Sequence, residues 1–180
     1  MTEARNRFPF SIKEPEVYQA DAYVRAGGEE ERFFLARKGG EWRYDTYRSG
    51  KPEISYLKNE KVYVLDHTVK TWREQPKGPD PLMPTITGEG MPGLFEGRDH
   101  PKFEKVSTDG AVTKYRATSD ETPGDIFIYF DTSLGMITRE EFPGIDGSQP
   151  WVYELRNIKT EVDDGLFAIP AGYKKSADKK

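Results

Sequence analysis

The sequence predicts an all-β fold built from antiparallel strands. Short segments rich in aromatic and β-branched residues recur about every ten positions and are separated by turn residues. Several segments alternate with the period of a half-buried strand, as in 151–156, where Trp, Tyr and Leu share one face. Dipeptides such as Gly27-Gly28 and Asp109-Gly110 tolerate positive φ, so they favour hairpins between successive strands.

The individual strands follow from this pattern of apolar alternation and turn chemistry. In the first half of the chain the predicted strands are 16–24, 30–37, 41–48, 54–57, 61–66 and 71–74. In the second half they are 102–107, 112–117, 125–131, 136–142 and 151–159. Two stretches, 33–35 and 126–130, are apolar on both faces, so a further segment has to cover their outer side.

We interpret the 180 residues as one domain, with an N-terminal arm (1–14), two groups of strands (15–75 and 98–173) and a solvated basic tail (174–180). The segment 76–97 interrupts the strand pattern and is rich in proline, glycine and apolar residues, which predicts a lid or plug. Hydrophobic residues make up only 35% of the chain, so the core depends on large aromatic side chains. The predicted lid residues are Leu82, Met83, Met91, Leu94 and Phe95.

Composition argues against several classes of partner. The net charge is −4, and outside the basic tail the two signs are interspersed, which does not suit a nucleic-acid partner. No apolar stretch is long enough for a transmembrane helix, and the first residues lack the apolar core of a signal peptide. The absence of cysteine excludes disulfides and thiolate metal sites.

Motifs for catalysis, cofactors or metals are weak. The GxGxxG match at 88–93 has no surrounding βαβ unit, so we interpret it as a flexible loop. His67 and His100 each follow an aspartate, but adjacent strand residues point to opposite faces, and we expect both histidines in turns. We therefore predict no catalytic residue, no cofactor and no metal, and a protein that binds rather than converts its ligand.

Three stretches are similar in strand order and content to a known family. They are 40–74, 136–155 and the ending 163–174, which contains a Phe-x-Ile-Pro-x-Gly-Tyr motif at 167–173. On these residues the chain resembles the LolA-like family of periplasmic lipoprotein carriers and their outer-membrane lipoprotein-sorting relatives. The carriers open with an amphipathic helix, whereas Phe8-Pro9-Phe10 leaves little room for one here.

The resemblance implies a strongly curved antiparallel sheet forming an incompletely closed half-barrel, whose concave apolar face shelters acyl chains. It also implies a periplasmic or outer-membrane-associated location, with the export signal removed. Lipid or lipoprotein acyl chains are then the expected partners, bound at about 0.8 kcal/mol per buried methylene. The predicted ligand-binding residues are Tyr18, Val24, Trp42, Tyr44, Ile126, Ile128, Trp151 and Tyr153.

Two alternatives remain open at this level. The same side chains could fill the barrel as an ordinary core, which would make the chain a structural or protein-interaction domain with an envelope protein as partner. A hydrolase that uses scattered acids and a histidine is the third candidate. The character of the interior separates them, because a ligand site needs an apolar cavity and an enzyme needs a cleft with convergent polar groups.

Overall fold

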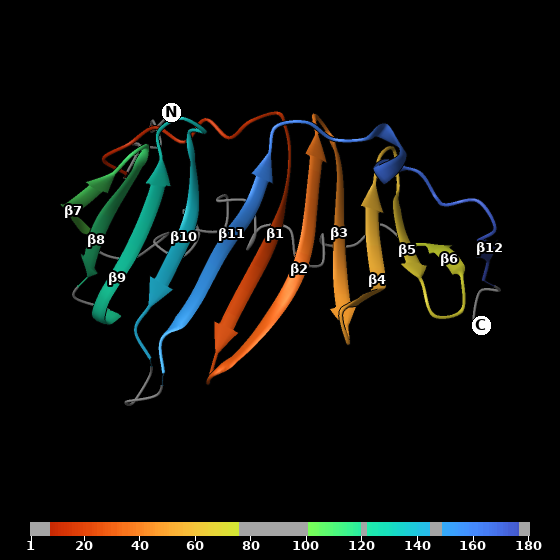
Figure 1. Cartoon of the computed structure of the whole chain (residues 1–180), viewed down its shortest axis with the longest axis horizontal. Helices are drawn as coiled ribbons and strands as arrows, with labels where there is room; N and C mark the ends of the chain where they lie inside the picture. The colour runs from red at the N-terminus through yellow and green to blue at the C-terminus, as the bar shows by residue number, and fades with distance from the viewer. Residues whose placement is uncertain (1–7, 76–100, 120–121, 145–148, 177–180) are drawn as a thin grey trace, which may run out of the picture. The chain divides into compact units, whose positions relative to one another are not determined.

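The computed structural model describes residues 8–75, 101–119, 122–144 and 149–176, and these residues form an all-β structure (Figure 1). In the first half of the chain the strands are β1 (Val17–Ala26), β2 (Glu29–Lys38), β3 (Glu41–Arg48), β4 (Lys51–Lys58), β5 (Val62–Asp66) and β6 (Thr71–Glu74). In the second half they are β7 (Lys102–Asp109), β8 (Val112–Ser119), β9 (Thr122–Asp131), β10 (Met136–Phe142), β11 (Trp151–Lys159) and β12 (Lys174–Lys175). The 3₁₀ helix η3 (Asp164–Phe167) is the only helical element that the described residues contain.

The strands follow one another in the hydrogen-bonded order β12-β6-β5-β4-β3-β2-β1-β11-β10-β9-β8-β7. Within β2–β6 and within β7–β11, each strand pairs antiparallel with the adjacent strand, as expected for hairpins. The order has two ends, so the strands do not close on themselves. The predicted all-β, antiparallel and incompletely closed fold is therefore confirmed, and each predicted strand is present with small differences at its ends.

The chain divides into two compact units that both draw on distant parts of the sequence. Unit 1 comprises Met1–Pro15, Val24–Glu30 and Asp80–Glu154, and unit 2 comprises Glu16–Tyr23, Glu31–Pro79 and Leu155–Lys180. The interpretation of the chain as one domain stays a prediction.

The core of unit 1 lies on one face of β8, β9 and β10. Alternation along β9 places Ile126, Ile128 and Phe130 on this face, with 4%, 0% and 5% of their surface exposed. Ala117 and Ile137 join them from the neighbouring strands. We call these five residues the apolar face of unit 1.

The N-terminal segment 8–15 packs against this apolar face without forming a strand or helix. The Phe10 ring stacks on Phe130 at a centroid distance of 4.3 Å, and Phe8 in turn stacks on Phe10 at 5.2 Å. The Lys13 amide donates a hydrogen bond of 2.8 Å to the Gly135 carbonyl. Gly135 has φ of 67°, and a Cβ there would lie 2.8 Å from the Lys13 carbonyl oxygen, so this contact requires glycine.

The outer side of β9 is covered by long cationic side chains of the neighbouring strands. Lys114 Nζ lies 4.0 Å from the ring centroid of Phe127 and 5.0 Å from that of Tyr129. The Arg139 guanidinium lies 5.4 Å from the Tyr129 ring centroid, and the Tyr129 hydroxyl donates to Glu141 at 2.9 Å. Cation–π contacts of this kind allow aromatic rings to face solvent.

The predicted lid, segment 76–97, lies outside the described residues, as do its candidate residues Leu82, Met83, Met91, Leu94 and Phe95. Its proposed role in covering the strands of either unit stays a prediction. His100 and the GxGxxG match at 88–93 also lie outside the described residues.

In unit 2, strands β2–β6 bury apolar side chains on both faces. Leu35, Tyr44 and Val64 lie on one face, and Leu57 and Leu65 lie on the other. Phe167 of η3 is also buried, with 5% of its surface exposed.

The C-terminal segment ends in the short strand β12, which pairs in parallel with β6. The Lys174 amide donates to the Lys70 carbonyl at 3.1 Å, and the Ser176 amide donates to the Trp72 carbonyl at 2.8 Å. The first two residues of the predicted solvated tail, Lys174 and Lys175, are therefore held by backbone pairing and are not frayed. Their backbone is held by the edge of β6, while both side chains remain exposed.

Candidate functional site

The described part of the chain contains neither a metal-binding cluster nor a membrane-spanning helix. No three His, Asp or Glu side chains within residues 8–75, 101–119, 122–144 and 149–176 come together in a way that could hold a metal ion. The helices in the same residues include none that is long and apolar enough to cross a membrane.

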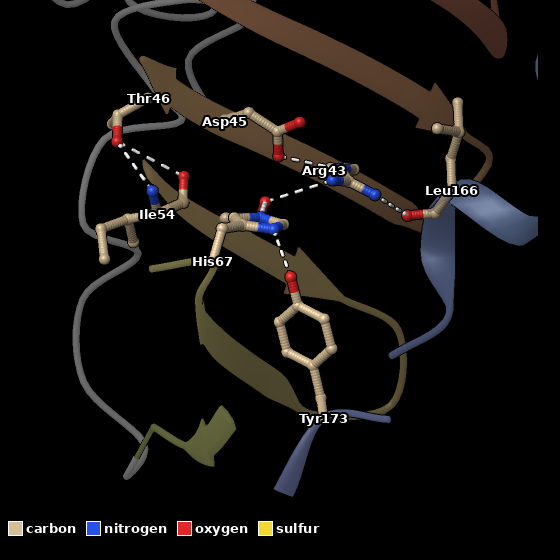
Figure 2. Close-up of polar contacts among 8 residues, drawn as sticks. Arg43, Asp45, Thr46, Ile54, His67, Leu166 and Tyr173 are labelled. Atoms are coloured by element: carbon tan, nitrogen blue, oxygen red, sulfur yellow. Dashed lines mark hydrogen bonds and ion pairs between the residues drawn. The ribbon is translucent and has the colours of Figure 1, made fainter. Parts of the chain in front are cut away.

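A polar cluster of several hydrogen bonds lies in unit 2 and centres on Arg43 (Figure 2). Its guanidinium pairs with the Asp45 carboxylate, with Nε 2.7 Å from Oδ1. The same group donates to the Leu166 carbonyl at 3.1 Å and to the Ser55 hydroxyl at 3.2 Å. Asp45 and Ser55 are buried, with 3% and 0% of their surface exposed. The cluster thus satisfies a buried charge with a matched partner and further hydrogen bonds.

His67 extends this cluster to the C-terminal segment. Its Nε2 lies 2.5 Å from the Ser55 hydroxyl oxygen and its Nδ1 lies 2.6 Å from the Tyr173 hydroxyl (Figure 2). Burial lowers the pKa of His67 below its usual 6.5, although the nearby Asp45 carboxylate opposes this. A neutral imidazole fits both contacts, because one nitrogen can donate and the other can accept.

The Ser55–His67 pair resembles a nucleophile and its base, but its surroundings do not suit catalysis. Ser55 is completely buried, and its hydroxyl already accepts from Arg43. Asp66 does not orient the imidazole either, because its carboxylate accepts the amide N–H groups of Thr68 and Val69 at 2.9 and 3.3 Å. Those bonds stabilise a turn, which confirms that His67 lies in one. The cluster therefore fastens Leu166 and Tyr173 to the sheet of unit 2.

A different kind of polar group lies in unit 1, on β10. Glu140 is directly opposite Ile128 of β9 and Tyr153 of β11. Opposed residues of antiparallel strands share a face, so the Glu140 side chain lies on the same side as the apolar face of unit 1. Only 5% of its surface is exposed. Burial raises the pKa of this carboxyl to about 8, so it is largely protonated at neutral pH.

Three aromatic side chains lie next to Glu140 on the same face. Tyr153 is its cross-strand neighbour, and Phe142 and Trp151, two residues further along each strand, form the next opposed pair on this face. The ring centroids of Phe142 and Trp151 are 5.0 Å apart, and those of Trp151 and Tyr153 are 6.4 Å apart in a stacked arrangement. Phe142 also packs against the apolar face. We call Glu140, Phe142, Trp151 and Tyr153 the Glu140 patch.

Four of the predicted ligand-binding residues meet in unit 1. Ile126 and Ile128 belong to the apolar face, and Trp151 and Tyr153 belong to the Glu140 patch that adjoins it. Val24, also assigned to unit 1, is half-buried. Their role in ligand binding stays a prediction.

The other predicted residues lie in unit 2. Tyr18 is buried, with 1% of its surface exposed. Trp42 and Tyr44 share one face of β3, where the Tyr44 ring stacks on Phe33 at 5.3 Å. Burial raises the pKa of the Tyr44 phenol well above its usual 10. These side chains form part of the interior of unit 2.

Sequence reasoning missed two residues of this region, Phe10 and Glu140. A signal for Phe10 existed in the closely spaced pair Phe8 and Phe10 within a polar arm. Glu140 follows Arg139 and precedes Glu141 in a strand with charged neighbours, so no local signal marks it as buried.

No family model matches the chain, and no curated protein matches it. Solved structures similar to it include an uncharacterised conserved protein of Thermus thermophilus, with 14% identity, 90% of each chain covered and a TM-score of 0.56. MucB is similar with 9% identity over 92% of this chain and a TM-score of 0.59. MucB in complex with MucA(peri) is similar with 10% identity over 84% of this chain and a TM-score of 0.53.

The chain covers 61% of MucB in the first of these MucB structures and 54% in the complex, so it spans little more than half of that protein. At identities this low, the likeness shows a shared fold and nothing finer.

Proposed function

We propose that this protein is a non-enzymatic binding protein of the cell envelope that accepts an acyl chain on the apolar face of unit 1. The observation that carries this proposal is the N-terminal segment, whose Phe10 ring covers that face at 4.3 Å from Phe130. An apolar surface covered by a segment without regular structure can exchange that cover for a ligand of similar character. Each buried methylene of an acyl chain contributes about 0.8 kcal/mol.

The exchange is energetically reasonable because the described contacts of the segment are mostly side-chain contacts. Phe8, Phe10 and Ile12 pack against the apolar face, while the amide of Lys13 makes the backbone hydrogen bond to Gly135. Losing a buried Phe contact costs about 1.5–3 kcal/mol by area, which a few methylenes offset. The role of Ile126, Ile128, Trp151 and Tyr153 as lining residues is part of this proposal.

A protein partner is the second candidate, favoured by one specific finding. MucB, which shares the fold, has been solved in complex with MucA(peri). A partner segment with two closely spaced aromatic residues could replace Phe8 and Phe10 in the same manner as an acyl chain. The resemblance implies a location in the cell envelope. The acyl-binding and the protein-binding proposal both include this location.

Fatty acids of increasing chain length test the leading version. Tryptophan fluorescence and the melting temperature should both respond, and the response should grow with chain length, because a ligand that binds only the folded state stabilises it. Phe10→Ala should bind the fatty acid more tightly than wild type, since the competing cover is weakened. A variant that is merely destabilised would bind less tightly or equally.

Phe127→Ala is the matched control, because Phe127 lies on the same strand but faces Lys114 on the other side. It should bind fatty acid like the wild-type protein. Absence of any response to any chain length, in both wild type and Phe10→Ala, would contradict acyl binding and leave the protein partner as the better explanation.

A further inference from the structure

Glu140 is an acidic side chain on an otherwise apolar surface. Its own strand and the neighbouring strands bury it, with 5% of its surface exposed. In the ranges that the structure describes, no hydrogen bond or ion pair joins its carboxyl to another residue; because no fully buried side-chain oxygen there lacks a partner, the carboxyl oxygens keep a slight contact with solvent. Burying a carboxyl without a partner destabilises a fold, so a purely structural position is better filled by an apolar side chain. The residue therefore points to a ligand.

The groups that face Glu140 are almost entirely without charge. On β9, β10, β11 and the N-terminal segment, the residues on this side are Ile126, Ile128, Phe130, Ile137, Phe142, Trp151, Tyr153, Phe8, Phe10 and Ile12. Among these, the Tyr153 phenol is titratable, and the Tyr115 phenol lies on the same face one strand further away, opposite Ile128. Three charged residues of β10 and β11 pair on the opposite face, where Arg139 lies 2.8 Å from Glu141 and 3.2 Å from Glu154.

Several aromatic rings in the described part of this protein have a cationic side chain over one face, and the rings of Phe142 and Trp151 do not. Lys114 lies 4.0 Å from the Phe127 ring, Arg156 lies 4.0 Å from the Tyr23 ring, and other pairs of this kind occur in both units. No Lys or Arg lies over Phe142 or Trp151 within the described ranges. Rings next to an unpaired carboxyl offer the two interactions that an organic ammonium group makes, which are ion pairing and cation–π contact.

We propose that the Glu140 patch binds the ammonium head group of an amphiphile whose acyl chain lies along the apolar face of unit 1. The carboxylate pairs with the positive charge, and Phe142, Trp151 and Tyr153 contact it through their ring faces. Phe142 and Trp151 are half-buried, so a ligand can reach the patch from their side. This inference rests on the proposed function and specifies its ligand as a cationic or zwitterionic lipid.

Binding of this kind depends on pH in a defined direction. Only the ionised carboxyl pairs with a cation, and the pKa of about 8 leaves a few per cent of it ionised at pH 6.5 and roughly nine tenths at pH 9. Affinity for a permanently charged head group should therefore rise about 30-fold between these two pH values.

Three dodecyl amphiphiles that differ in the head group test the inference, all below their micelle concentrations. Tryptophan fluorescence would measure binding of dodecyltrimethylammonium, dodecyl maltoside and dodecyl sulfate at pH 6.5 and pH 9. Wild type should prefer the trimethylammonium head, and the preference should grow at pH 9. Glu140→Gln should lose this preference and its pH dependence while still binding the maltoside. Glu141→Gln removes the neighbouring carboxyl on the opposite face and should behave like wild type.

A second measurement uses only the wild-type protein, so it does not require a variant that folds. Calorimetric titration of dodecyltrimethylammonium at pH 7.5, in two buffers of different ionisation enthalpy, should show release of about 0.75 proton per ligand, because a largely protonated Glu140 must ionise. Binding without proton release would overturn the inference.

The outcomes separate this inference from the proposed function. If none of the three amphiphiles binds at either pH, acyl binding itself fails. If all three bind with equal affinity, or if Glu140→Gln keeps the preference for ammonium, only the role of the Glu140 patch is wrong. Tighter binding of the sulfate at pH 6.5 would also overturn it, because it would mean that the protonated carboxyl donates to an anionic head group.

Discussion

Replacing Glu140 by Gln should change how the stability of the protein depends on pH. The folded chain holds the carboxyl proton up to a pKa of about 8, whereas the unfolded chain releases it near the ordinary value of 4.5. Between these values the folded state binds more protons, so stability falls as pH rises. At about 1.4 kcal/mol per pH unit, wild type should lose about 4 kcal/mol from this group between pH 5 and pH 9.

Urea unfolding of the full chain at pH 5, 7 and 9 measures this loss. Glu140→Gln cannot ionise at this position, so its loss between pH 5 and pH 9 should be smaller than that of wild type by about 4 kcal/mol. Glu104→Gln is the control, because Glu104 lies on the edge strand β7 with 64% of its side chain exposed, and its pairing with Arg116 contributes little. Parallel pH profiles for wild type and Glu140→Gln would refute the assignment of a buried, unpaired carboxyl.

Four further predictions concern the segments that pack onto the sheets and the His67 contact. Gly135→Ala should destabilise the protein by at least about 1 kcal/mol and expose the N-terminal segment to proteases, because a Cβ there meets the Lys13 carbonyl at 2.8 Å. Phe10→Ala should lower the free energy of unfolding by about 3–5 kcal/mol in urea titrations without ligand. The NMR titration of His67 should have its midpoint below 6.5, because burial lowers the pKa of the imidazole. The neutral imidazole stabilises the fold fully above pH 6.5, and this contribution is lost as pH falls through the lowered pKa. Tyr173→Phe should cost about 1 kcal/mol at pH 8 by removing the hydroxyl partner of His67.

The strands could be predicted because their signals are local. Apolar alternation marks each strand, and the turns between them contain residues that adopt positive φ, such as Gly110 at 55° and Gly135 at 67°. Hairpin pairing follows once successive strands are joined by short turns. Apolar alternation and turn residues therefore predict most of the strand pairs within β2–β6 and β7–β11.

Elements that depend on distant contacts could not be predicted in this way. Strand β12 has two residues and pairs in parallel with β6, so alternation cannot mark it, although a turn at 171–172 precedes it. Its position follows from the Tyr173 contact with His67, which joins residues 106 positions apart. The docking of Phe10 on Phe130 is likewise a tertiary contact of a segment that has no periodicity.

The position of Glu140 shows how one irregularity changes the meaning of a strand. Ile137 faces the core opposite Phe130, and strict alternation from it would direct Arg139 and Glu141 inward and Glu140 outward. The register shifts between Ile137 and Arg139, as in a β-bulge, so that Arg139 lies opposite Tyr129 and Glu140 lies opposite Ile128. An inward Arg139 would lose its ion pair with Glu154, and it would be buried on the apolar side together with Glu141. The bulge thus preserves the outward position of Arg139 and places a single carboxyl beside the apolar face, and bulges are common near functional sites.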